Sequence, residues 1–269
     1  MSYILLFLLK IHIMTFLQIQ EKINKNNPVD FGDVFGEAIN LFQKVWLQGF
    51  LLLVLSFLIQ YGLSLLMYIP AIALEFIVDD QALEGDFNIV AILVMILFLV
   101  LYLVTLIVVT TFNFGLQAAF YRIVRVKERN KRAELGINFG MFFKKKHIKK
   151  LFVFSMAQAG IGILAFMLCV IPILYVFIPL QFALIIFAFH PDLTINEIYK
   201  AAFNLGNAKW GVTFGLVFVS GILASIVGLV ACFIGIYFTL SFVYLPAYLV
   251  YKRVVGFYED DDAIAQIGA

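Results

Sequence analysis

The chain alternates between long apolar stretches without charge and short charged segments. The apolar stretches are Val45–Leu74, Phe87–Tyr121, Leu151–Pro191 and Trp210–Tyr251. A helix needs about 20 apolar residues to cross a bilayer, so the first two stretches predict one crossing each. The last two are long enough for two crossings each. Pro172 in one, and Gly228 and Gly235 in the other, are expected to mark the turns. The pattern therefore predicts six transmembrane helices arranged as three hairpins.

Composition supports the same class of protein. Hydrophobic residues make up 64% of the 269 residues, and charged residues make up 13%. A soluble domain is roughly 45–50% apolar and about 25% charged. We therefore predict an all-α integral membrane protein and exclude an ordinary soluble domain.

The positions of the charges predict the orientation. All 19 Lys and Arg residues lie outside the four apolar stretches, and short loops rich in Lys and Arg stay on the cytoplasmic side. The segment Glu75–Asp86 carries five acids and no base, as expected of an external loop. If every basic segment is cytoplasmic, an even number of crossings separates each pair of them. We predict a multi-pass protein of the bacterial inner (cytoplasmic) membrane with both termini in the cytoplasm.

Three regions are expected along the chain. Residues 1–29 form a leader, 30–255 a six-span membrane domain, and 256–269 an acidic cytoplasmic tail. The apolar part of the leader is short and is interrupted by Lys10, which favours an interfacial or frayed segment over a seventh span. Met14 is an alternative start, in which case residues 1–13 precede the true start.

An internal repeat relates two parts of the chain. Val29–Ser56 aligns with Leu193–Ser220 at an offset of 164, and this offset superposes the two tryptophans, Trp46 and Trp210. Each copy predicts an amphipathic helix in the cytoplasmic interface, followed by a tryptophan that anchors the chain at headgroup level. Leu135–Lys150 is a weaker third copy. Each of the three hairpins is therefore expected to follow one such interfacial helix.

Two segments carry a resemblance to a known family. They read CVIPILYVFIPLQFALIIFAFHPDLTINEIYKAAFNLGNAKWG and IGIYFTLSFVYLPAYLVY. With the helix before the first span, they resemble the bacterial membrane domain joined to some glycerophosphodiester phosphodiesterases, and its stand-alone six-span relatives. The resemblance covers roughly residues 30–255. It implies a six-helix inner-membrane fold without a defined activity. Some relatives carry a carotene-monooxygenase label, which implies four iron-binding histidines, whereas this chain has three.

The residues point away from catalysis. His12, His147 and His190 are far apart in the sequence, lack the spacing of metal-binding motifs, and are expected to be solvated or at headgroup level. We predict no catalytic residue, no cofactor and no metal site, and hence no enzyme. Whether Cys169 and Cys232 pair stays open.

Neutral polar residues within the predicted spans are candidates for a functional path. They are Gln60, Asn113, Gln117, Gln158 and Gln181. An amide in lipid needs hydrogen-bond partners, either on a neighbouring helix or on a substrate. Interhelical hydrogen bonding is the simpler interpretation, and a lined path is the alternative.

One segment concentrates the positive charge. Its eleven bases are Arg122, Arg125, Lys127, Arg129, Lys131, Arg132, Lys144, Lys145, Lys146, Lys149 and Lys150. Such a cluster beside a membrane attracts anionic lipid headgroups, and ribosomal RNA or an acidic protein would meet the same surface. No DNA partner is expected. The leading hypothesis is a non-catalytic protein that organises the bilayer or other membrane proteins, such as an accessory subunit of an envelope or protein-export complex. The alternative is a small-molecule or lipid transporter lined by neutral polar residues.

Overall fold

The computed structural model describes residues 14–77, 89–129, 139–168, 170–231 and 235–257. The helices are α2 (Phe16–Asn24), α3 (Phe31–Ile77), α4 (Ile89–Glu128), η2 (Met141–Phe143), α6 (Lys145–Met167), α7 (Val170–Phe189), α8 (Ile195–Val230), α9 (Ile236–Thr239), η3 (Leu240–Val243) and α10 (Tyr244–Val254). Some of the predictions concern residues outside the described ones. These are residues 1–13, most of the external loop, Lys131, Arg132, Cys169, Cys232 and the acidic tail. The same holds for the side chains of Lys145 and Lys146.

The described residues form helices and no strand, and five of these helices are long and apolar enough to cross a membrane. They are α3, α4, α6, α7 and α8. The chain is therefore an all-α, multi-pass membrane protein, as the charge-free stretches predict.

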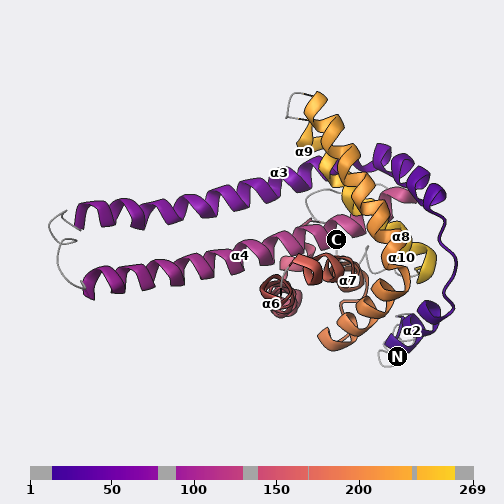
Figure 1. The fold of residues 1–269 in the computed structure, drawn as a ribbon, viewed down its shortest axis with the longest axis horizontal. Helices are drawn as coiled ribbons and strands as arrows, with labels where there is room; N and C mark the ends of the chain where they lie inside the picture. The colour runs from indigo at the N-terminus through magenta and orange to yellow at the C-terminus, as the bar shows by residue number, and fades with distance from the viewer. Residues whose placement is uncertain (1–13, 78–88, 130–138, 169, 232–234, 258–269) are drawn as a thin grey trace, which may run out of the picture.

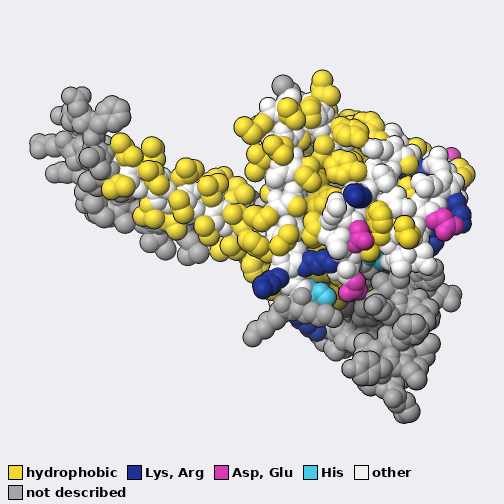
Figure 2. All heavy atoms as spheres, turned by 90° about the horizontal axis from the view of Figure 1, so that it is seen from below, with side chains coloured by type: hydrophobic (Ala, Val, Ile, Leu, Met, Phe, Trp, Pro, Cys, Tyr) yellow, Lys and Arg dark blue, Asp and Glu magenta, His cyan; other side chains and the backbone are white. Residues whose placement is uncertain are grey.

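Helices α3 and α4 form a long hairpin that projects from the rest of the molecule (Figure 1). They contain 47 and 40 residues. At 1.5 Å per residue they are about 70 and 60 Å long, roughly twice the thickness of the hydrocarbon core of a bilayer. Figure 2 shows apolar side chains covering the projecting arm, while charged side chains gather at the other end. The exposed apolar side chains on the arm include Leu58, Tyr61 and Leu103, so lipid is its expected surrounding.

The other helices cross this hairpin rather than run parallel to it. In Figure 1, α8 runs at a steep angle to α3, and α6 is seen nearly end-on. Helices α7 and α8 cross closely, and a Cβ added at Gly206 would lie 2.7 Å from Cγ and 3.0 Å from Cα of Pro179. Glycine at position 206 thus lets two helices approach more closely than any side chain allows.

The two best copies of the repeat begin at equivalent residues. Helix α3 starts at Phe31 and α8 at Ile195, and these positions differ by the predicted offset of 164. Each start is capped by the residue before it: Asp30 Oδ1 accepts from the Asp33 N–H at 2.9 Å, and Thr194 Oγ1 accepts from the Glu197 N–H at 3.3 Å. In both copies the predicted interfacial segment continues into the span as one helix, and α8 is kinked at Lys209.

The third copy is built differently. Its described part, from Phe139 onward, contains the short helix η2 and then the start of α6, with Lys144 extended between them. Phe139 and Phe142 are buried. The chain here packs by its aromatic side chains and not as a helix leading directly into a span.

The last apolar segment, residues 236–254, is broken into α9, η3 and α10. Pro246 explains the break, because it lacks the N–H that would bond the Phe242 carbonyl, and its ring would clash with that carbonyl in an α-helix. The residues before it form the tighter helix η3 instead. Here α3 approaches closely, since a Cβ added at Gly49 would lie 2.1 Å from Ser241 Oγ.

The turns fall close to their predicted places. Helix α6 ends at Met167 and α7 begins at Val170, so Pro172 lies in the first turn of α7, where proline is tolerated. Helix α8 ends at Val230 and α9 begins at Ile236, so Gly228 lies in the last turn of α8 and Gly235 directly precedes α9. Gly228 packs against Ile236, and the Thr239 hydroxyl donates to the Ala224 carbonyl at 2.7 Å.

The described part of the leader is ordered. Thr15 caps α2 through a reciprocal pair of bonds with Gln18, and Met14, Ile19 and Ile23 are buried. Asn204 Nδ2 on α8 donates to Gln20 Oε1 at 2.7 Å. From Phe16 to Asn24 the leader is thus a helix packed on α8.

Candidate functional site

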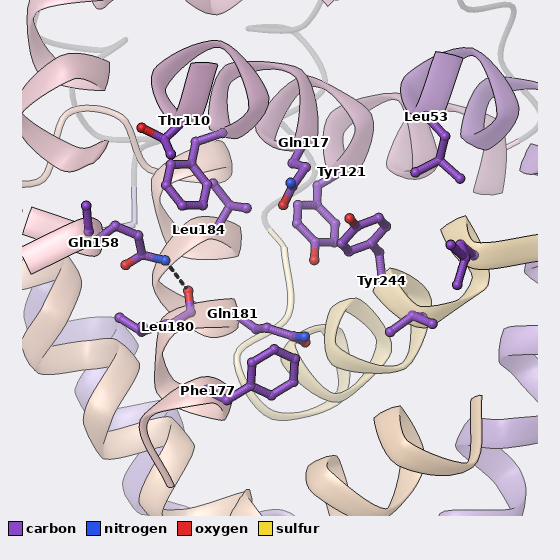
Figure 3. Close-up of a pocket in the computed structure, with 14 residues that line it drawn as sticks. Leu53, Thr110, Gln117, Tyr121, Gln158, Phe177, Leu180, Gln181, Leu184 and Tyr244 are labelled. Carbon is purple, nitrogen blue, oxygen red and sulfur yellow. Dashed lines mark hydrogen bonds between the residues drawn. The ribbon is translucent and has the colours of Figure 1, made fainter. Parts of the chain in front are cut away.

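A cavity of about 480 Å³ lies between α4, α6, α7 and η3 (Figure 3). Helix α4 contributes one face, whose residues recur at helical spacing: Thr110, Phe114, Gln117 and Tyr121. Helix α7 contributes the facing side with Phe177, Leu180, Gln181 and Leu184. Leu240, Val243 and Tyr244 come from the broken segment.

Gln158 of α6 fixes the position of three helices. Its Nε2 donates to the Leu180 carbonyl of α7 at 2.9 Å, and its Oε1 accepts from the Tyr199 hydroxyl of α8 at 2.8 Å. The Tyr199 ring stacks on Phe154, with ring centroids 5.8 Å apart. Both ends of the Gln158 amide are therefore used for interhelical hydrogen bonds, although the residue also lines the cavity.

Gln181 lines the same cavity but differs from Gln158 in its hydrogen bonding. Its Oε1 is buried and has no hydrogen-bond partner among the described residues. In Figure 3, Gln117 and Tyr121 of α4 point toward the same space from the opposite side. The cavity thus combines an apolar wall with amide and phenol groups that converge from two helices.

Aromatic side chains close the cavity at one end. The Tyr121 ring centroid is 6.4 Å from those of both Tyr244 and Tyr248, and Phe120 lies 6.2 Å from Tyr244. The Tyr248 hydroxyl donates to Glu128 Oε2 at 2.7 Å. Charged groups therefore begin on the far side of this aromatic layer.

Those charged groups form ion pairs that link α3, α4 and α10. We call them the ionic cluster, and its members are Asp33, Glu37, Arg125, Glu128, Lys252 and Arg253. Lys252 Nζ bonds both Glu37 and Glu128, and Arg253 bonds Glu37 at 3.0 Å. Arg125 pairs with Glu128 at 3.3 Å. The Lys252 side chain is 30% exposed and that of Glu128 is 16% exposed, so the cluster is partly shielded from solvent.

Further polar contacts join the remaining helix ends on this side. Arg122 Nε donates to the Ala188 carbonyl at the end of α7. Lys150 Nζ, near the start of α6, donates to the carbonyls of Pro191 and Leu193 in the turn between α7 and α8. These contacts therefore form one continuous polar layer. It contains the starts of α3, α6 and α8 and the ends of α4, α7 and α10.

The five amides within the predicted spans separate into two groups. Gln117, Gln158 and Gln181 line the cavity. Gln60 is exposed on the outer part of α3, and Asn113 Nδ2 donates to the Val109 carbonyl of its own helix at 2.9 Å. The first three therefore come together at one site.

The two tryptophans have different surroundings. Trp46 is 45% exposed and lies 6.0 Å from Phe238, ring centroid to ring centroid. Trp210 Nε1 donates to the Tyr175 carbonyl at 3.0 Å. Pro179 lacks the N–H that would bond this carbonyl within α7. Trp210 therefore supplies a donor that the helix itself lacks, in addition to any anchoring at the headgroups.

The basic segment is not one uniform surface. Arg122 lies over the Phe142 ring at 5.3 Å, Arg125 over the Phe257 ring at 4.2 Å, and Lys150 bonds backbone carbonyls. These three bases hold the fold together. Lys127 and Arg129 are half-buried at the end of α4, and Lys144 and Lys149 are exposed. A partner or headgroup would therefore meet fewer bases than the sequence contains.

His190 differs from the sequence expectation, because it is fully buried and not solvated. It follows α7 and contacts the end of α10, where its Nε2 lies 2.7 Å from the Tyr251 hydroxyl. Burial lowers the pKa of His190 to about 4, and the positive charges of Arg122 and Lys22 add to this effect. The imidazole is therefore neutral at pH 7.

We expect acid to destabilise the protein through His190. The unfolded chain, with a pKa of 6.5, takes up a proton before the folded chain does, so stability is lost as the pH falls from 6.5 toward 4. At pH 5.5 the loss is about 1.4 kcal/mol. Unfolding in detergent at pH 7.5 and 5.5 measures it. His190→Gln should remove this pH dependence, whereas His147→Gln should keep it; equal pH dependence in all three proteins would contradict the prediction.

Sequence reasoning missed the contributions of Tyr121 and Tyr244 to the cavity and the pairing of Glu37 with Lys252. A tyrosine in an apolar stretch usually indicates a headgroup-level residue, so neither tyrosine stood out. Pro246 was the available signal for the broken segment.

Comparison with protein-family models, curated proteins and solved structures finds no match to this chain.

Proposed function

We propose that the chain binds a neutral, largely apolar molecule in the cavity between α4 and α7 and carries it within or across the membrane. The observation that supports this most is that Gln181 and Gln158 line one cavity beside the short helix η3. A transporter lined by neutral polar residues requires such an arrangement. Amides and phenols can orient a ligand. Because the described residues that line the cavity include no acid–base pair, we propose binding without catalysis.

We further propose six crossings in the bacterial inner membrane, with the broken segment 236–254 as the sixth and both termini in the cytoplasm. The continuous polar layer supports this topology, because six crossings put those same helix ends on the cytoplasmic side. Along α4, Tyr121 lies about 10 Å and Thr110 about 27 Å from Glu128, so the cavity lies at the depth of the hydrocarbon core. The proposal is also compatible with the resemblance to the six-span relatives of the phosphodiesterase membrane domain.

Organisation of partner proteins through the basic segment is the weaker proposal. Arg122, Arg125 and Lys150 are engaged within the fold, which reduces the positive surface that an anionic headgroup, ribosomal RNA or an acidic protein would contact. The cavity does not depend on such a partner.

Photolabelling tests the proposed binding site. The protein in nanodiscs is exposed to hexadecanol carrying a mid-chain diazirine, and the labelled peptides are identified by mass spectrometry. We expect labelling at α7 around Leu184. Ala159→Phe, which fills the cavity from α6, should reduce that labelling about tenfold. The matched control is Ala157→Phe, on the same helix but outside the cavity, and it should leave labelling unchanged. Labelling spread over the lipid-facing surface and unaffected by Ala159→Phe would overturn the proposal.

A further inference from the structure

Among the described residues that line the cavity, one buried side-chain acceptor has no hydrogen-bond partner. Gln181 Oε1 is buried without a partner among the described residues. Gln158, on the same cavity, has a partner at each end of its amide. Because a buried polar group is costly unless it is hydrogen-bonded, Gln181 is the group that gains most from a ligand with a donor.

The ligand that fits this cavity carries no charge. The described residues that line it have apolar side chains, amides, phenols and the Thr110 hydroxyl, and none of them is charged. Glu128 is bonded by the Tyr248 hydroxyl, and Tyr248 stacks on Tyr121. Glu128 is already bonded by Lys252 and Arg125. A phosphate or carboxylate headgroup would therefore be desolvated without a counter-charge, which is strongly unfavourable.

We infer that the cavity takes a neutral lipid alcohol, an apolar molecule with a single hydroxyl group; this inference rests on the proposed function. The ligand hydroxyl donates to Gln181 Oε1 and accepts from the Tyr121 hydroxyl, which points into the cavity from α4 (Figure 3). The apolar part lies against Leu184 and Leu240. An alcohol satisfies both polar groups at once, whereas an ether can only accept and a hydrocarbon does neither.

The test compares two probes that differ only in the donor. Diazirine-bearing hexadecanol and its methyl ether are photolysed with the wild-type protein in nanodiscs, and labelling of α7 is quantified. We expect the alcohol to label roughly tenfold more than the ether. In Gln181→Leu the preference should fall to about one, because alcohol labelling decreases and ether labelling does not. Gln60→Leu, the same change at an exposed position on α3, should keep the wild-type preference.

The outcomes distinguish this inference from the proposed function. If both probes labelled α7 equally and Ala159→Phe abolished this labelling, the alcohol preference would be overturned. The proposed binding site would still be supported. An unchanged preference in a folded Gln181→Leu protein would overturn the role of Gln181. Absence of α7 labelling by either probe would overturn both the inference and the proposed function. Size-exclusion chromatography of each variant identifies the folded proteins.

Discussion

Gly206→Ala is expected to lower the free energy of unfolding by about 1–3 kcal/mol and to reduce ligand binding. The added methyl group would lie 2.7 Å from Cγ and 3.0 Å from Cα of Pro179. Part of this contact is backbone, so a side-chain rotation cannot relieve it, and α7 must move away from α8. Residues 177, 180, 181 and 184 of α7 line the cavity, and they would move with it. Denaturant unfolding in detergent, together with the photolabelling assay, measures both effects.

Gly211→Ala is the matched control for this prediction. A Cβ added at Gly211 meets nothing within 4 Å, and alanine is a better helix former than glycine by up to about 1 kcal/mol. We therefore expect unchanged or slightly higher stability and normal binding. If the two variants behaved alike, the close crossing of α7 and α8 would not be a determinant of the fold.

Lys252→Met is expected to destabilise the protein by about 2 kcal/mol. Lys252 bonds Glu37 and Glu128, and its loss leaves two partly buried carboxylates without their shared cation. The value lies between those for a fully buried and a surface ion pair, because the side chains of Lys252, Glu37 and Glu128 are 16–33% exposed. The thermal unfolding midpoint in detergent gives the direction, and denaturant unfolding gives the free energy.

A surface ion pair on α2 supplies the control. Lys25 and Glu21 lie 3.0 Å apart with side chains 64% and 67% exposed. Lys25→Met should therefore cost less than about 0.5 kcal/mol. Adding Glu37→Gln to Lys252→Met should recover part of the lost stability, because one of the uncompensated charges is removed. A double variant less stable than Lys252→Met would refute the assigned role of Lys252.

Much of the helical architecture follows from local sequence. Asp30 and Thr194 have side chains that accept N-terminal backbone hydrogen bonds, and α3 and α8 begin directly after them. The charge-free stretches give the long helices, because a helix satisfies its own backbone groups in an apolar surrounding. The break in residues 236–254 is also local in origin, since Pro246 cannot continue the α-helical bonding pattern.

The tertiary contacts could not be predicted from the local sequence. His190 is buried because the turn after α7 packs against the end of α10, more than 60 residues further along the chain. Arg122 and Lys150 look like parts of a basic surface in the sequence, but their charges meet carbonyls of distant segments. The sequence contains no periodicity that reports such pairings.

The candidate site was only partly predictable. Gln158 and Gln181 are unusual in apolar helices and were therefore identified by their polarity alone. Their different states were not predictable, because they depend on which atoms of α7 and α8 come within hydrogen-bond distance. Tyr199 of α8 donates to Gln158 of α6, whereas no donor among the described residues reaches Gln181 Oε1.

Native mass spectrometry of the protein released from nanodiscs tests the central claim most directly. We expect wild-type protein and Ala157→Phe to retain one uncharged lipid per chain when hexadecanol is present, whereas Ala159→Phe should retain none. Release of all three proteins without a bound lipid, or retention of the same lipid by all three, would contradict the claim that the cavity between α4 and α7 is a binding site.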